Sequence, residues 1–323
     1  MRKVVTADIG GTHARFAIAT IERGQVMEVG EPVTLKTGEF VSFERAWSRF
    51  EQRVGSKLPR DLSLAVAAPI ANDEFTLTNS HWQIRPTQIV SELELNSILL
   101  INDFAAVAHA ICAVDETQLL HIAGPDEPLP ASGVITIVGP GTGLGAALLV
   151  REETQGYRVV ETEGGHIDFA PLDVLEDKIV AELRTKFGRV SVERLVSGPG
   201  LLNIYEVLSK LEGLTEVTRD EAALWSSALD RTDQLAGIAL DRFCMCLGAV
   251  AGDLALAHGA SAVVIAGGIG KRLRDRLTNS GFTTRFVAKG RFERRLAATP
   301  VKLITYAEPG LLGAAVAFAR KHS

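Results

Sequence analysis

Two glycine-rich turns, one in each half of the chain, are the residues best suited to bind a charged ligand. Gly10-Gly11-Thr12 follows the apolar run 4–9, and Gly139-Pro-Gly-Thr-Gly143 follows the matching run 134–139. A further apolar run comes after each turn, so each copy predicts a strand, a turn and a second strand. Glycine lets the backbone bend sharply and present its N–H groups to an anion without a Cβ in the way. The repeat predicts a duplicated fold that binds one polyphosphate from both sides.

The two copies differ at one informative position. Asp8 in the first copy corresponds to Val138 in the second. A lone carboxylate beside a phosphate-binding turn usually serves a magnesium ion rather than the phosphate itself. We therefore expect Asp8 to hold Mg²⁺, through a water molecule.

Asp103 follows the apolar run 97–101, at the carboxyl end of a predicted buried strand. Ligands of open α/β sheets bind just outside such strand ends. A carboxylate placed there can accept a proton from a substrate hydroxyl. Asp103 can equally cap the helix expected over 104–113, and the two roles are compatible. Its neighbour Asn102 has the same two interpretations, helix cap or hydrogen-bonding ligand.

The segment Glu163-Gly-Gly-His166-Ile-Asp168 places two glycines between a carboxylate and an imidazole. This spacing predicts a turn that directs both side chains at one small site. Neighbouring hydroxyls of a sugar need such a pair of acceptor and donor groups. One alternative is a metal site built from Glu163, His166 and Asp168. Another is a plain surface turn with polar residues and no ligand. We favour a polyol over a metal because no further His or Cys cluster lies nearby.

Three other segments can be explained by ordinary structural roles. Glu193 is expected to be a solvated helix residue paired with Arg194 or Arg189, and such pairs contribute little to stability. The polar run 78–82 is expected to be a turn. Gly267-Gly268 follow a buried strand and could let a purine ring approach the backbone, although a strand-to-helix turn is the stronger interpretation.

The composition excludes several classes of partner. The 323 residues are 46% hydrophobic and carry a net charge of -5, which gives no basic field for nucleic acid or anionic lipid. Cys112, Cys244 and Cys246 lie in apolar stretches, an odd and sparse set that fits a reducing cytoplasm better than a disulfide framework. We find neither a signal peptide nor an uncharged stretch of about 18 apolar residues, and expect a soluble cytoplasmic protein without membrane contact.

Strands and helices alternate along the chain, which indicates α/β sheets with crossover connections. Beyond the glycine hairpins, strands are expected over 62–68, 97–101 and 261–266, and helices over 43–54, 104–113, 172–187, 241–257 and 310–320. The acidic segment 124–132 is expected to separate the two repeats. The last helix is expected to pack on the first domain. We expect a small domain of residues 1–110 plus 309–323 and a large domain of residues 111–308.

These blocks together resemble the bacterial glucokinase family, ATP-dependent relatives of hexokinase without the zinc motif of the repressor/open-reading-frame/kinase (ROK) sugar kinases. The matching strings run in the family's order over nearly the whole chain: Ala7-Asp-Ile-Gly-Gly-Thr12, Leu77-Thr-Asn-Ser-His-Trp82, Ile101-Asn-Asp-Phe104, Gly139-Pro-Gly-Thr-Gly-Leu-Gly145, Glu163-Gly-Gly-His-Ile-Asp-Phe-Ala-Pro171, Ser197-Gly-Pro-Gly200 and Pro309-Gly-Leu-Leu-Gly313. One departure is His13, where many members have Asn.

The resemblance implies an actin/hexokinase-like ATPase fold: duplicated α/β domains, each a mixed sheet flanked by helices, with a cleft between them, commonly as a homodimer. The implied activity is phosphorylation of D-glucose at the 6-hydroxyl by ATP with Mg²⁺, the first step of glycolysis. An ATP-driven switch or a sugar-sensing regulator on the same fold is the alternative, but no effector domain is visible.

The resemblance also implies the roles of individual residues. Asp103 would be the catalytic base. The implied sugar ligands are Asn79, Asn102, Asp103, Glu163, His166 and Glu193. The implied phosphate-binding residues are Ala7, Asp8, Ile9, Gly10, Gly11, Thr12, Gly139, Gly141, Thr142 and Gly143, with Gly267 and Gly268 at the adenosine.

Overall fold

The chain forms two compact units in a computed structural model that describes residues 1–68, 74–76, 82–154, 156–214 and 220–322. The first unit comprises Met1–Asp115 and Tyr306–Ser323, and the second Glu116–Thr305. The segment 124–132 was expected to separate the repeats, and this expectation is wrong. Strand β9, Leu119–Ala123, already pairs with β14, Val301–Ile304, so that 124–132 lies inside the second unit.

A mixed six-stranded sheet forms the centre of the first unit. Its order is β3-β2-β1-β5-β8, with β4 also paired to β2. The hairpin β1–β2 is antiparallel, whereas β5 and β8 run parallel to β1. The strands of this unit are β1 Arg2–Ile9, β2 His13–Glu22, β3 Gln25–Val29, β4 Val33–Lys36, β5 Asp61–Val66 and β8 Ser97–Asn102, with a separate hairpin of β6 Phe75–Thr76 and β7 Gln83–Ile84. Strand β8 is half-buried rather than buried, because it lies at the edge of the sheet.

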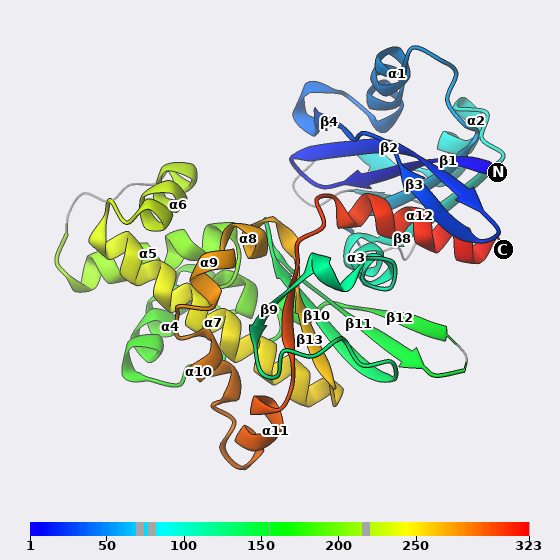
Figure 1. The fold of residues 1–323 in the computed structure, drawn as a ribbon. Helices are drawn as coiled ribbons and strands as arrows, with labels where there is room; N and C mark the ends of the chain where they lie inside the picture. The colour runs from blue at the N-terminus through cyan, green and yellow to red at the C-terminus, as the bar shows by residue number, and fades with distance from the viewer. Residues whose placement is uncertain (69–73, 77–81, 155, 215–219, 323) are drawn as a thin grey trace. The chain divides into compact units, whose positions relative to one another are not determined.

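Helices cover both faces of this sheet (Figure 1). Alternate residues of a strand point to opposite faces, so Val5 of β1 packs in one hydrophobic cluster with α1, and Val4 packs in another with α12. The helices are α1 Phe43–Val54, α2 Pro86–Glu92, α3 Asp103–Ile111 and α12 Pro309–Lys321. The Thr6 hydroxyl donates to the carbonyl of Leu311 in α12 at 2.7 Å. The last helix therefore packs on the first unit, as predicted.

The second unit repeats this sheet design. Its order is β12-β11-β10-β13-β14-β9, again with an antiparallel hairpin beside parallel strands. Its strands are β9 Leu119–Ala123, β10 Gly133–Pro140, β11 Leu144–Glu152, β12 Gly156–Thr162, β13 Ala262–Ile265 and β14 Val301–Ile304. The duplication predicted from the two glycine turns is confirmed, because β1, β2 and β5 correspond to β10, β11 and β13.

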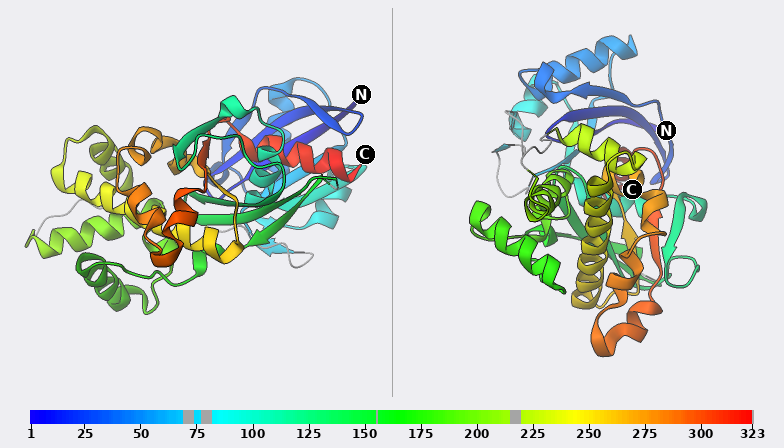
Figure 2. Two further views of the ribbon diagram at one scale, coloured as in Figure 1. Left: turned by 60° about the horizontal axis from the view of Figure 1, so that its bottom comes forward. Right: turned by 90° about the vertical axis from the view of Figure 1, so that its left-hand side faces the viewer.

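A 25-residue helix, α7, lies at the centre of the second unit's helical layer (Figure 2). The helices of this unit are α4 Val174–Phe187, α5 Gly198–Leu211, α6 Glu221–Asp230, α7 Gln234–His258, α8 Gly267–Arg272, α9 Arg274–Leu277, α10 Phe282–Val287 and α11 Glu293–Ala297. In the described part of the chain, α7 alone is long and apolar enough to resemble a membrane span, but 67% of its apolar window is buried inside the protein. Burial raises the pKa of the Cys244 thiol in α7 to about 12, as expected for an inert core cysteine.

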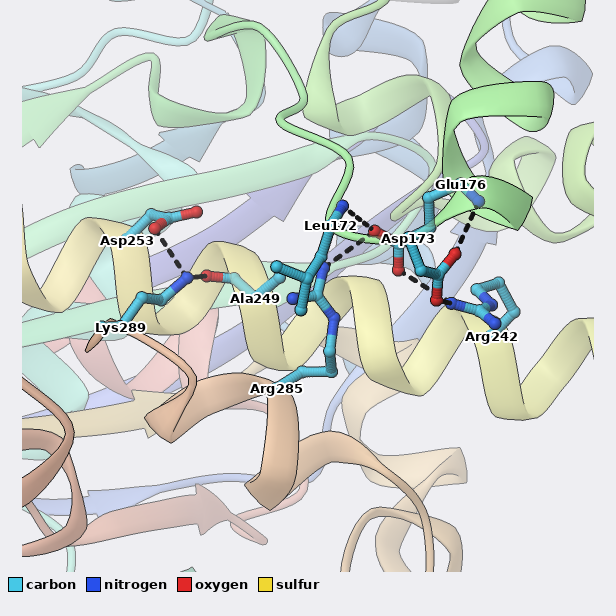
Figure 3. Close-up of polar contacts among 8 residues, drawn as sticks. All are labelled: Leu172, Asp173, Glu176, Arg242, Ala249, Asp253, Arg285 and Lys289. Atoms are coloured by element: carbon cyan, nitrogen blue, oxygen red, sulfur yellow. Dashed lines mark hydrogen bonds and ion pairs between the residues drawn. The ribbon is translucent and has the colours of Figure 1, made fainter.

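Buried ion pairs join α4, α7 and α10 (Figure 3). Glu176 is fully buried, and its two carboxylate oxygens accept from Arg242 at 3.0 Å and from Arg285 at 2.8 Å. The same carboxylate accepts the backbone N–H of Leu172 at 2.8 Å. Asp173 caps α4 and also pairs with Arg242. Removing one partner of such a buried pair costs about 3–5 kcal/mol, so this network fixes the start of α4 firmly.

Candidate active site

The two glycine turns share one pattern of exposure. Residues 11–20 and 141–150 have the same succession of buried, half-buried and exposed side chains, with Thr12 and Thr142 exposed at the tips. The turns differ in length by one residue. Ile9 pairs with Ala14 across the first turn, whereas the last pair of the second hairpin leaves only residues 141–143 between its strands. The second turn is therefore the tighter one.

Thr37 holds the first turn in place. Its hydroxyl donates to the carbonyl of Gly11 at 2.6 Å, and its backbone N–H donates to the carbonyl of Thr12 at 3.1 Å. Sequence analysis missed this residue, because nothing near Thr37 marks it as a partner of the turn. Burial and the charges of Arg15 and Lys36 lower the pKa of His13, so this imidazole is neutral near pH 7.

Asp8 lies under the first turn on β1, with about a fifth of its side chain exposed. Arg15 on the neighbouring strand lies 3.9 Å from it and also pairs with Glu308 at 3.1 Å. Burial raises the pKa of Asp8 to about 6, since the opposing effect of Arg15 is partly offset by Glu308. A partly buried carboxylate with one distant arginine partner fits a hard cation such as Mg²⁺. No group of three or more His, Cys, Asp or Glu side chains suited to a metal occurs among the described residues.

Glu193 lies against the second turn. Its carboxylate accepts the backbone N–H of Leu144 at 2.9 Å, and a Cβ on Gly143 would lie only 2.3 Å from one of its oxygens. The expectation that Glu193 pairs with Arg194 or Arg189 as a solvated helix residue is wrong. Arg194 instead stacks over Phe187, so the carboxylate is left for the turn.

Gly267 also packs against the second turn. It has a φ of +82°, and a Cβ on it would lie 2.5 Å from the carbonyl oxygen of Pro140. The strand-to-helix turn therefore explains by itself why residue 267 is glycine. At Gly268, in contrast, a Cβ would meet no atom within 4 Å. Space for a ligand is thus found at Gly268 rather than at Gly267.

Asn102, not Asp103, caps α3. The Asn102 side-chain oxygen accepts the N–H groups of Phe104 at 2.8 Å and of Ala105 at 3.1 Å. Asp103 is the first residue of the helix, and its carboxylate accepts the adjacent N–H of Phe104 at 2.9 Å. Asn102 therefore serves as the helix cap, and the Asp103 carboxylate is not needed for that role.

The Glu163–His166 segment forms the predicted turn. The backbone N–H of His166 donates to the carbonyl of Glu163 at 3.0 Å, and residues Gly164–His166 form a short 3₁₀ helix. A Cβ on Gly165 would lie 2.1 Å from the carbonyl oxygen of Leu144. Only glycine allows this segment to pack so closely on the end of the second turn.

Two short backbone bonds bring this segment beside Glu193. Phe169 donates to the carbonyl of Val190 at 3.1 Å, and Val192 donates to the carbonyl of Ile167 at 2.9 Å. Within the second unit, the structure thus brings together Glu163, His166, Glu193 and the turn Gly139–Gly143. Sequence analysis did not foresee this pairing, because the bonds join segments more than 20 residues apart.

The remaining predicted residues lie on β1 and in the string that ends at Trp82. The side chains of Ala7 and Ile9 are fully buried in the core, so only their backbone could face a ligand. Asn79 lies outside the described residues. Trp82, at the end of the same string, is a core residue whose indole donates to the carbonyl of Phe40 at 2.8 Å.

Comparisons with known proteins agree along the whole chain. A family model described as glucokinase matches residues 5–321. The chain is 56% identical to a curated glucokinase of Zymomonas mobilis over 99% of both proteins. It resembles the crystal structure of a glucokinase from an Antarctic psychrotroph, with a TM-score of 0.83, 34% identity and full coverage of both chains. A glucokinase of Balamuthia mandrillaris in complex with glucose shares the fold at a TM-score of 0.79 and 19% identity, over 99% of this chain and 94% of that one. The actin/hexokinase-like fold expected from the sequence is confirmed.

Proposed function

We propose a residue-level mechanism from one premise: this chain belongs to the glucokinase family. It catalyses ATP-dependent phosphorylation of glucose. The proposal concerns how its residues do so, with the 6-hydroxyl as the acceptor and glucose 6-phosphate and ADP as products. The observation that carries it is the contact between Glu193 and Leu144, which joins a set of polar side chains suited to a polyol to a glycine turn suited to phosphate.

The sugar ligands we propose are Asn102, Glu163, His166 and Glu193, together with Asn79. Carboxylates accept hydrogen bonds from sugar hydroxyls, and an imidazole can donate or accept. The Asn102 amide can donate through its NH₂ group, because its oxygen caps α3. A site of this kind discriminates against an analogue that lacks one hydroxyl, because the polar partner of that hydroxyl is then left unpaired. The turn at Glu163–His166 supports this assignment, since it places both residues at the two ends of one short 3₁₀ helix.

The two glycine turns are proposed to bind the phosphates of ATP. Backbone N–H groups of Gly11–Thr12 and Thr142–Gly143 donate to phosphate oxygens, and Thr37 keeps the first of these turns in shape. Such donors are fixed before the reaction, so they need not reorganise as negative charge moves to the leaving oxygen. Gly268 is the proposed point of approach for the adenosine, because its surroundings leave room there.

Asp103 is proposed to accept the proton of the 6-hydroxyl as that oxygen attacks the γ-phosphorus. Phosphoryl transfer depends mainly on positioning and charge stabilisation, and a base removes the proton from the attacking hydroxyl. Because Asn102 already caps α3, the Asp103 carboxylate does not have to serve as that cap.

Asp8 is the residue we propose for holding Mg²⁺, through water. Bound Mg²⁺ would neutralise charge on the phosphates during transfer. Arg15 and Glu308 orient the Asp8 carboxylate and set its charge.

The cellular setting completes the proposal. We expect a cytoplasmic enzyme of glycolysis that works as a homodimer, an assembly that light scattering on the purified protein would test. None of the three cysteines forms a disulfide, and two of them are buried, in keeping with a reducing compartment.

The direct test of the proposed acceptor is an ADP-release assay with MgATP across a panel of hexoses, followed by NMR analysis of the product. We expect release only with added hexose and phosphorus attached at the 6-position of glucose. Phosphorylation at another hydroxyl would contradict the placement of Asp103, and release without hexose would contradict the proposal as a whole.

A further inference from the structure

We infer that Arg189 is a positioning residue for the sugar-binding side chains of the second unit. The inference rests on the proposed function, because it takes His166 and Glu193 as sugar ligands. Arg189 lies between them in the chain and outside every motif that the sequence analysis singled out. Its role follows from the contacts of its guanidinium group.

The guanidinium of Arg189 spans the exposed end of the paired segments. It donates to the backbone carbonyl of His166 at 2.8 Å and to the carboxylate of Asp168 at 2.9 Å. A second guanidinium nitrogen also donates to the His166 carbonyl. Arg189 therefore ties the backbone of one proposed sugar ligand to the segment that leads, four residues later, to Glu193.

The two ends of the segment from His166 to Leu172 are held differently. Its far end is anchored in the core, because Phe169 is buried and the Leu172 N–H donates to the buried Glu176. At the near end, His166, Ile167 and Asp168 all have exposed side chains. Side-chain packing does not fix this near end. The backbone bond from Val192 to the Ile167 carbonyl and the hydrogen bonds from Arg189 hold it together.

These contacts contribute little to global stability. The Arg189 side chain is 57% exposed and that of Asp168 is 73% exposed, and ion pairs at such exposure are worth about 0–1 kcal/mol. Arginine suits the position because its planar guanidinium presents several N–H donors in a fixed fork, whereas a lysine ammonium is a compact charge on a flexible stem. The expected benefit is local: an ordered His166 spares the sugar the cost of ordering it on binding.

The test uses the full chain carrying Arg189→Met or Arg189→Lys, with steady-state kinetics for both substrates and a melting curve. Arg189→Met should raise KM for glucose about tenfold while kcat and KM for ATP change less than about twofold, a factor of ten being about 1.4 kcal/mol. Arg189→Lys should recover part of the loss. The matched control is Arg158→Met, which removes an arginine that is 76% exposed and paired with Glu152 in the same unit. It should leave all the constants unchanged.

A double variant separates this inference from the proposed site. If Arg189 acts through His166, then Arg189→Met should raise KM for glucose less than about twofold in the His166→Ala background. Independent, multiplicative effects would overturn the inference, as would an unchanged KM in Arg189→Met or a parallel loss of ATP binding and melting temperature. A His166→Ala variant with normal KM for glucose would instead overturn the sugar site itself.

Discussion

The two glycine turns have the same backbone design and acquire their carboxylates in different ways. Under the first turn, Asp8 comes from the strand that leads into it. At the second, the corresponding residue is Val138, and the carboxylate belongs to Glu193, 49 residues beyond the Leu144 N–H that it accepts. A duplicated fold can thus keep its geometry while the two copies assign their acidic groups to different tasks.

The surroundings of the two acids indicate what those tasks are. Asp8 lies below its turn, where burial raises its pKa to about 6, and we propose that its carboxylate holds Mg²⁺. Glu193 lies beside its turn and is hydrogen-bonded to it, next to the Glu163–His166 segment. We therefore expect changes at Asp8 and Asp103 to affect chemistry and charge, and changes that disturb Glu193 or the Glu163–His166 segment to affect recognition of the sugar.

The largest expected effect tests the chemical side of this comparison. Asp103→Asn should lower kcat by roughly 10²–10⁴-fold, the usual worth of a positioned acid–base group. KM for glucose should stay within about tenfold, because the amide can still pair with a hydroxyl. The melting temperature should hardly change, since Asn102 and not Asp103 caps α3. A folded variant that keeps most of its kcat would show that the proton goes elsewhere.

Glu163→Gln tests the recognition side. Loss of a charged partner for a sugar hydroxyl should weaken glucose binding by about 1–3 kcal/mol. Calorimetric titration with glucose and, separately, with an ATP analogue would measure both affinities. Nucleotide binding should be nearly unchanged, and an equal loss of both affinities would contradict the assignment.

A pair of glycine variants tests the contact between the second turn and Glu193. Gly143→Ala would place a Cβ 2.3 Å from the Glu193 carboxylate, which must then move. We expect KM for glucose to rise about tenfold, or about 1.4 kcal/mol. Gly141→Ala is the matched variant, because its Cβ would meet no atom within 4 Å, and it should affect ATP alone. Identical kinetic profiles for the two variants would refute the separate role of Glu193.

The smallest effect concerns the pH dependence of stability at Asp8. The pKa of Asp8 rises from 3.8 to about 6 on folding, so the native state binds the proton more tightly than the unfolded chain. Stability should therefore fall as pH rises from about 4 to about 6 and then level off, by on the order of 1 kcal/mol for a side chain still partly exposed. Asp8→Asn should lack this fall when urea midpoints are compared at pH 4.5 and 7. A parallel pH profile in both proteins would contradict the shifted pKa.

Sequence patterns predicted the parts of the site that depend on local chain geometry. The helices near 43–54 and 104–113 and the strands flanking both turns follow from apolar periodicity and glycine placement, and each was found close to its predicted range. The expected separator 124–132 failed, because the pairing of β9 with β14 links residues nearly two hundred positions apart and leaves no local mark.

The sequence by itself determined the two hairpins, the duplication and the turn at Glu163–His166, since these depend on backbone conformations that a few adjacent residues dictate. Tertiary structure alone decided that Asn102 caps α3, that Thr37 holds the first turn and that Glu193 reaches the second. Each of these outcomes is a choice among several possible hydrogen-bond partners. Such a choice is settled only when packing fixes which donors and acceptors lie within about 3 Å of one another.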